Sequence, residues 1–307
     1  MKVYWAIYAK LKNLKLGLSH EDDVDGIVSA SLFLRKFPNS VLILGQPSEI
    51  KDSIFCWYNW ITWDFVADLP CPARVKVYAD HHKTNKPKRV EVLYYNPQAP
   101  SAASLTIIAL GLEGDKISEE IVKVANDADT GRYSLEESIL LNDAIKGADY
   151  HGKLYIAREM SKIGLEVLKN PRINKWIEIN RRRRERASLI AERIETSPIL
   201  IVEFERDVDI PYRDLCLKLE RKGANELCAI IVPKGRRWRI YLGASRESSY
   251  DCSLLATKLG GGGHKSAAGA MVKDKQRIYA LLKDFLNTDK IKVVLVKNKN
   301  NINTLEV

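Results

Sequence analysis

The chain has 307 residues and a formal net charge of +10, so it is moderately basic and long enough for two domains that each bury a core. It contains no run of about 18 apolar residues that could span a bilayer, no signal-peptide cleavage site and no Cys-x-x-Cys pair among its five cysteines. These observations exclude a membrane span and a zinc ribbon, and they predict a cytoplasmic protein with an anionic partner such as nucleic acid or a nucleotide.

An acidic loop follows the first predicted strand, at 14–18, and precedes a predicted helix at 27–37. If the loop is extended, Asp23 and Asp25 direct both carboxylates to one side, because residues i and i+2 share a face. Two carboxylates held so near each other repel, and a divalent cation bound between them usually relieves the repulsion. A solvated loop that caps the helix is the alternative interpretation.

Acidic residues also end two later strands. The alternation of apolar residues predicts strands at 41–44, 60–67 and 74–80. Asp68 follows the middle one, and Asp80-His81-His82 closes the last. Ligands gather beyond the carboxyl ends of strands in an open α/β sheet, so these residues can form one site. Asp64 is an alternative to Asp68, but its position within the apolar run is less suitable.

Helices follow from about Ser101, a plausible N-cap, to Gly111 and from 117 to 128. Asp129 lies where the second of these helices gives way to a glycine turn. A helix C-terminus is an unfavourable place for an acid, which mildly favours a ligand role for Asp129.

The second half of the chain indicates a helical connection and a smaller domain. The pattern is helical from 135 to about 197 and includes the basic strip Arg181–Arg186, which is either a solvated face or a phosphate-binding patch. We expect an α/β fold with a mostly parallel N-terminal sheet flanked by helices over 1–175, a helical linker over 176–198 and a smaller α/β domain over 199–307. In the last domain, strands are predicted at 199–204, 227–232, 237–244 and 270–272, and helices at 214–221, 252–259 and 276–286.

A glycine-rich turn lies between a predicted helix and strand of this domain. Gly260, Gly261, Gly262 and Gly263 precede His264 and Lys265. Consecutive glycines are entropically costly to order, and they let backbone N–H groups approach an anion. A flexible hinge is the alternative. Arg246, after a strand, is a second candidate for binding phosphate or a base.

In combination, these motifs resemble the DHH phosphoesterase superfamily, in the branch with a C-terminal DHH-associated domain that includes RecJ-like exonucleases, oligoribonucleases and cyclic-dinucleotide phosphodiesterases. The matching residues occur in the family's order: Asp23-Val-Asp-Gly26, Asp68, Asp80-His-His82, Asp129-Thr-Gly131 and Gly261-Gly-Gly-His264 with Ala267-Ala-Gly269.

The resemblance implies a hydrolase with two divalent cations, usually Mn²⁺. Asp23 would then hold one metal, Asp25, His81 and Asp129 the other, and Asp68 would bridge them. Asp80 and His82 would be catalytic, with His82 facing the substrate phosphate. The residues implied to bind substrate are His82, Arg246, Gly261, Gly262, Gly263 and His264.

The chain departs from the family pattern at one ligand. Many relatives place a metal-binding His four residues before the first Asp of the Asp-x-Asp pair, where this chain has Ser19. His20 follows one residue later. Either His20 reaches the metal, or Glu21 or water completes the coordination.

The predicted function is hydrolysis of short RNA or DNA, or of linear or cyclic dinucleotides, to nucleoside monophosphates. Short substrates are expected because the chain lacks an added nucleic-acid-binding domain, although the Arg181–Arg186 strip and Trp238 could contribute to an exonuclease groove. A homodimer is compatible with this prediction. The alternative is a non-catalytic relative that serves as a scaffold in DNA replication or repair.

Overall fold

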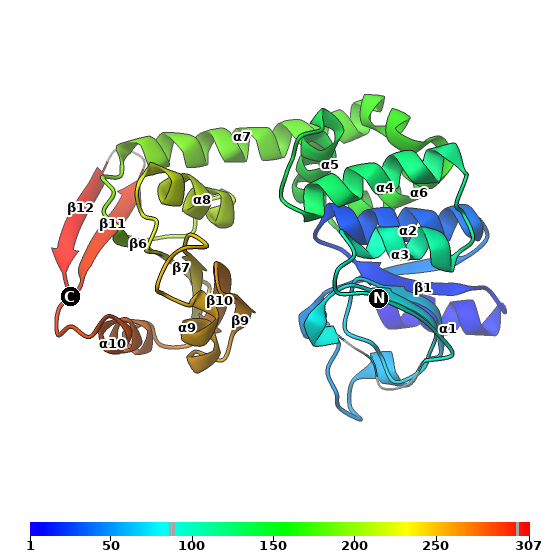
Figure 1. The fold of residues 1–307 in the computed structure, drawn as a ribbon, viewed down its shortest axis with the longest axis horizontal. Helices are drawn as coiled ribbons and strands as arrows, with labels where there is room; N and C mark the ends of the chain where they lie inside the picture. Colours follow the sequence, from blue (N-terminus) through cyan, green and yellow to red (C-terminus); the bar gives the residue numbers. More distant parts are fainter. Residues whose placement is uncertain (86, 88–89, 299–300) are drawn as a thin grey trace. The chain divides into compact units, whose positions relative to one another are not determined.

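The computed structural model describes residues 1–85, 87, 90–298 and 301–307 and contains two compact units, Met1–Asn180 (unit 1) and Arg181–Val307 (unit 2) (Figure 1). Each unit has its own sheet covered by helices. The predicted α/β class, with a parallel N-terminal sheet and a smaller C-terminal domain, is confirmed. The boundary between the two units along the chain lies within the long helix α7 (Pro171–Arg193). This helix overlaps the expected linker at 176–198.

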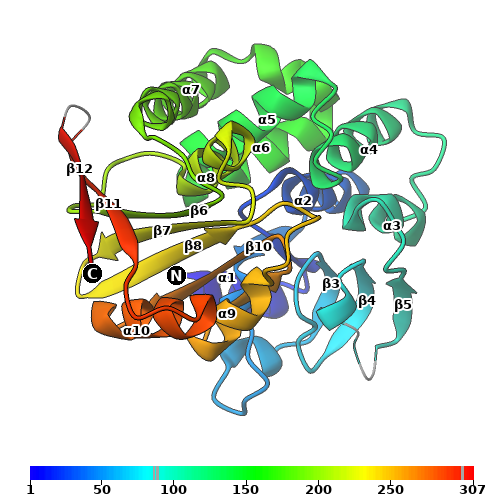
Figure 2. The same cartoon turned by 60° about the vertical axis from the view of Figure 1, so that its left-hand side comes forward.

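Unit 1 is built on a fully parallel sheet in the order β2-β1-β3-β4-β5. Figure 2 shows β3, β4 and β5 side by side. The strands are β1 (Leu16–His20), β2 (Val41–Gly45), β3 (Trp63–Ala67), β4 (Val75–Asp80) and β5 (Val92–Tyr95). Because all five run in one direction, their carboxyl ends meet at one edge of the sheet.

Helices cover both faces of this sheet. The α-helices of unit 1 that precede α7 are α1 (Lys2–Leu11), α2 (Val24–Lys36), α3 (Ala102–Ala109), α4 (Lys116–Asp129), α5 (Glu136–Gly147) and α6 (Tyr150–Ile163). Short 3-10 turns lie at Pro47–Glu49, Trp57–Asn59, Lys83–Asn85 and Gly164–Lys169. Helices α2 to α6 share one apolar core with the sheet, in which Phe33 of α2 stacks on Phe65 of β3 with ring centroids 5.5 Å apart.

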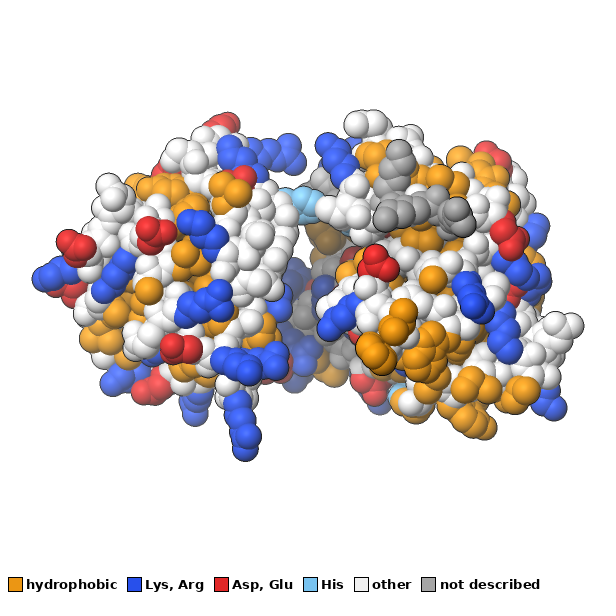
Figure 3. Space-filling view, turned by 90° about the horizontal axis from the view of Figure 1, so that it is seen from below, with side chains coloured by type: hydrophobic (Ala, Val, Ile, Leu, Met, Phe, Trp, Pro, Cys, Tyr) orange, Lys and Arg blue, Asp and Glu red, His pale blue; other side chains and the backbone are white. Residues whose placement is uncertain are grey.

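Helix α1 packs on the other face in an unusual way. Its small residues Ala6 and Ala9 are buried against the sheet, whereas Tyr4 is 64% exposed and Leu11 is 80% exposed. In Figure 3, hydrophobic side chains gather on the visible face of unit 1, the side on which α1 lies in Figure 1. None of the described helices combines the length and the apolar character that a membrane span requires.

Unit 2 has a mixed sheet in the order β12-β11-β6-β7-β8-β10-β9. Helix α8 lies on one face, and α9 and α10 lie on the other (Figure 2). The strands are β6 (Ile199–Phe204), β7 (Leu227–Lys234), β8 (Arg237–Gly243), β9 (Gly262–His264), β10 (Ala267–Val272), β11 (Lys292–Asn298) and β12 (Asn301–Glu306). The helices are α8 (Tyr212–Lys222), α9 (Cys252–Lys258) and α10 (Lys275–Leu286).

Several elements differ from the sequence predictions. Helix α1 and strands β5, β9, β11 and β12 were not expected, and the strand predicted at 60–67 begins at Trp63 because Trp57–Asn59 forms a 3-10 turn. Helix α2 begins at Val24 rather than Ile27, which places Asp25 inside the helix. The glycine-rich turn is partly strand, since Gly262–His264 pairs with β10.

Candidate metal centre

The loop between β1 and α2 places Asp23 at a helix start. Asp23 has an extended backbone and caps α2, with Oδ1 accepting a hydrogen bond of 2.9 Å from the Gly26 amide. Its Oδ2 atom lies 2.7 Å from Nδ1 of His20, the last residue of β1. Burial opposes ionisation, but His20 and the amide outweigh it and hold the pKa of Asp23 well below its usual range. Asp23 therefore caps the helix and keeps one ionised oxygen beside His20.

Asp25 points elsewhere, so the expected extended arrangement of the two carboxylates is wrong. Asp25 lies in the first turn of α2, is buried, and accepts hydrogen bonds of 2.7 Å from the amides of Ala102 and Ala103 at the start of α3. A helix N-terminus is a favourable place for a carboxylate. Burial and the carboxylates of Asp129 and Asp23 nevertheless raise the pKa of Asp25 well above its ordinary value.

Asp68 lies between the loop that follows β1 and the loop that follows β4. It follows β3 directly, with a left-handed φ of +56° that Asp tolerates better than most residues. Its side chain is 1% exposed, with Oδ2 3.4 Å from Nδ1 of His20 and Oδ1 3.4 Å from Nδ1 of His82. Burial and the surrounding carboxylates raise the pKa of Asp68 well above its ordinary value. The Oδ2 atom is buried without a hydrogen bond.

Asp80 is fully occupied by hydrogen bonds at the end of β4. Its Oδ1 accepts from the amides of His81 at 2.7 Å and His82 at 2.9 Å, and lies 2.9 Å from Nδ1 of His82. Its Oδ2 accepts from the Tyr78 hydroxyl at 2.7 Å and from Nδ2 of Asn85 at 2.8 Å. Burial alone would raise the pKa of Asp80, but the hydrogen bonds from His82 and Tyr78 lower it. Asp80 thus orients the two histidines.

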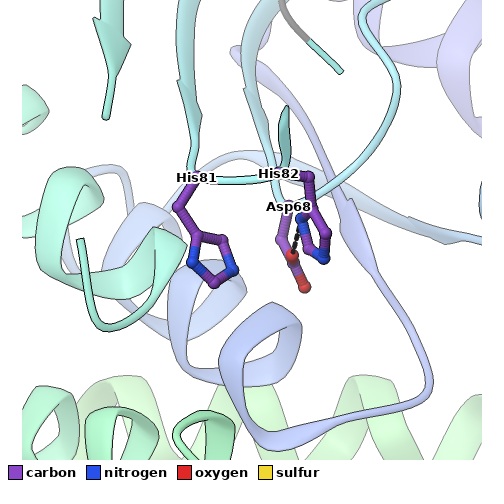
Figure 4. A group of neighbouring side chains, drawn as sticks. All are labelled: Asp68, His81 and His82. Carbon is purple, nitrogen blue, oxygen red and sulfur yellow. Dashed lines mark ion pairs between the residues drawn. The ribbon is translucent and has the colours of Figure 1, made fainter. Parts of the chain in front are cut away.

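The two histidines of the triplet lie side by side, with ring centroids 4.6 Å apart and ring planes at 71°, and they make different contacts (Figure 4). His82 is half-exposed, and its hydrogen bond to Asp80 raises its pKa, so Nε2 is the ring atom that remains for other contacts. His81 directs Nδ1 to the carbonyl of Ala99 at 3.1 Å and Nε2 to Oδ2 of Asp129 at 3.3 Å. Burial, reinforced by other carboxylates, raises the pKa of Asp129.

Three groups of these side chains have ligand atoms within 4.8 Å of one another. They are His20-Asp23-Asp68, Asp25-His81-Asp129 and Asp68-His81-His82. Two buried atoms that lack any hydrogen bond, Oδ2 of Asp68 and Nε2 of His81, belong to these groups. Buried polar atoms normally have a partner. Carboxylates mixed with imidazole suit Mn²⁺ and related divalent cations, so these residues fit such a group.

The structure brings His20 rather than Glu21 to the centre. Glu21 accepts hydrogen bonds from Lys2 at 3.3 Å and Gln46 at 2.8 Å, away from Asp23. The hydroxyl of Ser19 donates to the carbonyl of Gly26 at 2.7 Å. Asp64, the alternative to Asp68, is outside the centre and forms ion pairs with Lys10, Lys15 and Lys76.

The predicted substrate residues of unit 2 lie in two segments that are tied together. Arg246 is exposed in the turn after β8, and His264 is exposed at the end of β9. The amides of Ala244 and Cys252, on either side of Arg246, bind the carbonyls of Ser266 and Lys265 in the β9–β10 turn at 3.2 and 2.9 Å. Close packing requires glycine at position 261, because a Cβ there would collide with the carbonyl of Gly269.

Sequence reasoning missed the residues that hold the centre in place. Tyr78 and Asn85 fix Asp80, and the α3 amides fix Asp25. The polar hydroxyl of Tyr78 within a buried strand was a usable signal, since a buried tyrosine normally has a hydrogen-bond partner. The α3 contacts come from backbone amides, so no side chain in the sequence indicates them.

No family model matches the sequence, and no curated protein does. Among solved structures, the pGpG-specific phosphodiesterase PggH from Vibrio cholerae has a TM-score of 0.62 at 18% identity, with 89% of this chain and 99% of that chain covered. Exonuclease RecJ bound to manganese has a TM-score of 0.55 at 14% identity, with 92% of each chain covered.

A third structure, the DHH domain of a member of a family of ribosomal proteins, has a TM-score of 0.56 at 13% identity and covers 92% of this chain and 88% of its own. The chain has the DHH fold. The likeness to DHH proteins extends over both units, so the resemblance drawn from the motifs is confirmed at the level of the fold. In this DHH fold, Asp80 ends β4 and His81 and His82 follow it, with Nδ1 of His82 3.4 Å from Oδ1 of Asp68.

Proposed function

We propose that the chain is a DHH-family phosphodiesterase that uses two divalent cations, most suitably Mn²⁺, to hydrolyse short nucleic acids or linear or cyclic dinucleotides to nucleoside monophosphates. The observation that carries the proposal is the pair of ligand groups His20-Asp23-Asp68 and Asp25-His81-Asp129, whose buried Asp68 Oδ2 and His81 Nε2 atoms lack hydrogen bonds. The similarity to PggH and RecJ supports the same reaction class.

Each group would hold one cation. Oδ2 of Asp68 lies 3.4 Å from Nδ1 of His20 in the first group, and Asp68 also has a ligand atom within 4.8 Å of one on His81 of the second group, so Asp68 would contribute to both cation sites. When bound, two such cations supply an activated water and neutralise charge on the phosphate. The tight Nδ1 contact of His81 with the Ala99 carbonyl fixes the ring so that Nε2 remains the coordinating atom.

His82 would act on the substrate itself. Asp80 raises the pKa of His82 and holds its Nδ1, so the half-exposed ring can present a proton at Nε2 to a phosphate oxygen or to the leaving group. Asp80 is in this proposal a positioning residue, because all its hydrogen bonds go to the protein.

Incubation of purified protein with Mn²⁺ and a labelled linear dinucleotide tests the proposal. We expect nucleoside monophosphates from the wild-type protein and a loss of at least 100-fold in rate for Asp68→Asn. Asp64→Asn is the matched control, because Asp64 is an acid of the same strand region that lies outside the centre. Inactivity of the wild-type protein on linear dinucleotides, cyclic dinucleotides and oligonucleotides across Mn²⁺, Mg²⁺ and Co²⁺ would instead support the scaffold alternative.

A further inference from the structure

Helix α1 turns its large apolar residues away from the core. The sheet buries only the two alanines of the helix, and the opposite side exposes Tyr4, Ile7 and Leu11. Residues spaced by three and four positions lie on one side of a helix, so these three form a single stripe. A contiguous apolar surface that is left in water is typical of a site that binds an apolar partner.

The segment that follows β2 adds a second exposed apolar group. Ile54, Phe55 and Trp60 all lie on the surface, and Phe55 is 84% exposed. Nε1 of Trp60 donates a hydrogen bond of 2.6 Å to the carbonyl of Ile54. This bond ties the tip of the loop to the end of the 3-10 turn Trp57–Asn59. The side chains of Ile54 and Phe55 are therefore held at the tip of a hydrogen-bonded loop.

Both elements cover the same face of the unit 1 sheet. Ala6 of α1 shares an apolar core with Ile50 and Tyr58 of the second segment, on the opposite side of the sheet from the core of α2. Nζ of Lys2 also donates a hydrogen bond of 2.7 Å to Oε2 of Glu49. Figure 3 shows hydrophobic side chains gathered on this side of unit 1.

The exposed residues of the two elements are called here the apolar patch. Its principal members are Tyr4, Trp5, Ile7, Leu11, Ile54 and Phe55.

The charge beside the apolar patch is positive. Every charged residue before Glu21 is a lysine, so α1 contains no acid. Near the end of α1, one carboxylate, that of Asp64, pairs at 3.2, 3.6 and 2.9 Å with three lysines, Lys10, Lys15 and Lys76. One carboxylate cannot neutralise three ammonium groups, so an excess of positive charge remains for an anionic partner.

These features disfavour a second copy of the chain and a nucleic acid as the partner. Two stripes of α1 packed on each other would bring lysine against lysine without an acid of α1 between them. Bases of single-stranded RNA stack on aromatic rings, but Ile7, Leu11 and Ile54 offer no ring. The second segment adds no net charge at its tip, where Lys51 and Asp52 are both exposed.

A lipid surface matches both the apolar and the charged residues. Tyr and Trp favour the boundary between lipid and water, because each has an apolar ring and a polar atom. The ring of Trp5 packs edge-on against Tyr4 and Tyr8, with centroids 5.6 Å apart in each pair, so these rings form one exposed aromatic group. Long lysine side chains can keep their ammonium groups at the headgroups while the neighbouring apolar residues enter the lipid.

We propose that the apolar patch binds the surface of a bilayer that contains anionic phospholipids. Helix α1 would lie in the plane of the membrane, with its stripe and the Ile54-Phe55 tip at the boundary between headgroups and acyl chains. The lysines beside α1 would contact the headgroup phosphates. The patch contains no residue of the candidate metal centre, so the proposal does not depend on the proposed function.

Sedimentation of the full chain with lipid vesicles tests the proposal. The vesicles contain phosphatidylcholine alone or phosphatidylcholine mixed with phosphatidylglycerol, and EDTA prevents divalent cations from linking the metal centre to headgroups. We expect the wild-type protein to bind the anionic vesicles about 10-fold or more tightly than the neutral ones, because several lysines each contribute. Added salt should reduce this difference.

Single substitutions in the apolar patch should weaken binding without loss of fold. We expect a reduction in affinity of about 10-fold for Phe55→Ser and about 5-fold for Ile7→Ser. Ile108→Ser is the matched control, because Ile108 is 43% exposed on helix α3, Ile7 is 50% exposed on α1, and the two helices cover opposite faces of the sheet. Lys12→Gln removes an exposed charge and should reduce affinity for anionic vesicles by about 5-fold.

The proposal is overturned if the wild-type protein does not bind anionic vesicles. It is also overturned if Ile7→Ser and Phe55→Ser bind as well as wild type while Lys12→Gln does not, since net charge alone then explains the adsorption. An equal loss in Ile7→Ser and Ile108→Ser would likewise refute a role for this face.

Two further measurements distinguish the other partners. Analytical ultracentrifugation would identify the apolar patch as an interface between copies if the wild-type protein is a dimer and Ile7→Ser is a monomer. Titration with a labelled oligonucleotide would identify a nucleic-acid surface if Ile7→Ser and Phe55→Ser lower that affinity and leave vesicle binding unchanged. Either result overturns the proposal, whereas a lack of hydrolysis with Mn²⁺ would refute only the proposed function.

Discussion

Nε2 of His81 lies 3.3 Å from Oδ2 of Asp129, and no hydrogen bond joins them. The Nδ1 atom of His81 lies 3.1 Å from the Ala99 carbonyl, and a ring that donates a hydrogen bond there has its Nε2 lone pair directed toward Asp129. A cation held by Nε2 of His81 and Oδ2 of Asp129 would give the buried Nε2 atom the partner it lacks, so this geometry leads to tests of metal binding.

Metal should stabilise the fold measurably. Addition of Mn²⁺ to about 100 times its dissociation constant is expected to raise the free energy of unfolding by about 2.7 kcal/mol. Asp68→Asn should lose most of this gain, because it removes the bridging carboxylate, and should be no less stable than wild type in EDTA, because it also removes charge repulsion. Thermal melts over a Mn²⁺ titration provide the measurement. An unchanged metal response in Asp68→Asn would contradict the assignment.

Asp64→Asn separates this effect from a general loss of charge. Asp64 is paired with Lys10 and Lys76 near the amino-terminal end of the central strand β3. The variant should melt at a lower temperature than wild type while it retains the full gain from Mn²⁺.

Replacement of Asp80 should impair turnover and stability without removing the metal. Asparagine cannot accept hydrogen bonds from the Tyr78 hydroxyl, Asn85 and the His82 ring together. Asp80→Asn is therefore expected to lower the free energy of unfolding by about 3 kcal/mol and to reduce kcat. Calorimetry with Mn²⁺ should show near wild-type affinity. A loss of metal affinity as large as that of Asp68→Asn would instead identify Asp80 as a ligand.

A single methyl group at Gly26 should disturb the centre indirectly. Alanine is favoured over glycine within a helix by about 1 kcal/mol. At Gly26, however, the added Cβ would lie 2.6 Å from Cβ of His20 and would collide with the His20 carbonyl. We expect Gly26→Ala to be destabilised rather than stabilised and to bind Mn²⁺ about 10-fold more weakly, as measured by calorimetry. Gly262→Ala, in open space, should leave Mn²⁺ affinity unchanged, and a stabilised Gly26→Ala with normal affinity would refute the packing argument.

The pairing of Arg35 with Asp115 predicts an acid-sensitive contribution to stability. Arg35 donates hydrogen bonds of 2.6 and 2.8 Å to the two Asp115 oxygens, and Asp115 also caps α4. This hydrogen bonding lowers the pKa of Asp115 below its usual value. A lowered folded-state pKa stabilises the fold above the unfolded value of about 3.9 and loses this contribution as the pH falls below it.

Asp115→Asn should accordingly cost about 1–3 kcal/mol at pH 7, and its difference from wild type should shrink toward pH 3. Urea unfolding at both values checks the change. Glu159→Gln, which breaks only an exposed pair with Lys162, should cost less than about 0.5 kcal/mol. A difference for Asp115→Asn that stays constant with pH would contradict the role of ionisation.

The sequence predicted the positions of site residues where a polar residue ended a short run of apolar residues. Asp68 and Asp80 were predicted at strand ends because β3 and β4 are short apolar runs, and parallel strands bring such ends together. The direction of Asp25 was not predictable, because it depends on the amides of α3, some 77 residues away along the chain. No local pattern contains that contact.

Two other elements were missed for different physical reasons. Helix α1 has large apolar residues on its outer side and alanines inside, so it lacks the usual amphipathic pattern. Strand β9 consists largely of glycine, which has no side chain to show alternation, and only pairing with β10 makes it a strand.

The hydrogen bonds around Asp80 also affect how related sequences should be interpreted. A chain that had lost hydrolysis would still need this carboxylate to satisfy Tyr78, Asn85 and two backbone amides, so selection for folding alone would retain it. Asp129, at a helix end where its charge is electrostatically unfavourable, has no comparable structural duty. Loss of hydrolysis during evolution should therefore appear first as drift at Asp129, while the Asp of the triplet persists.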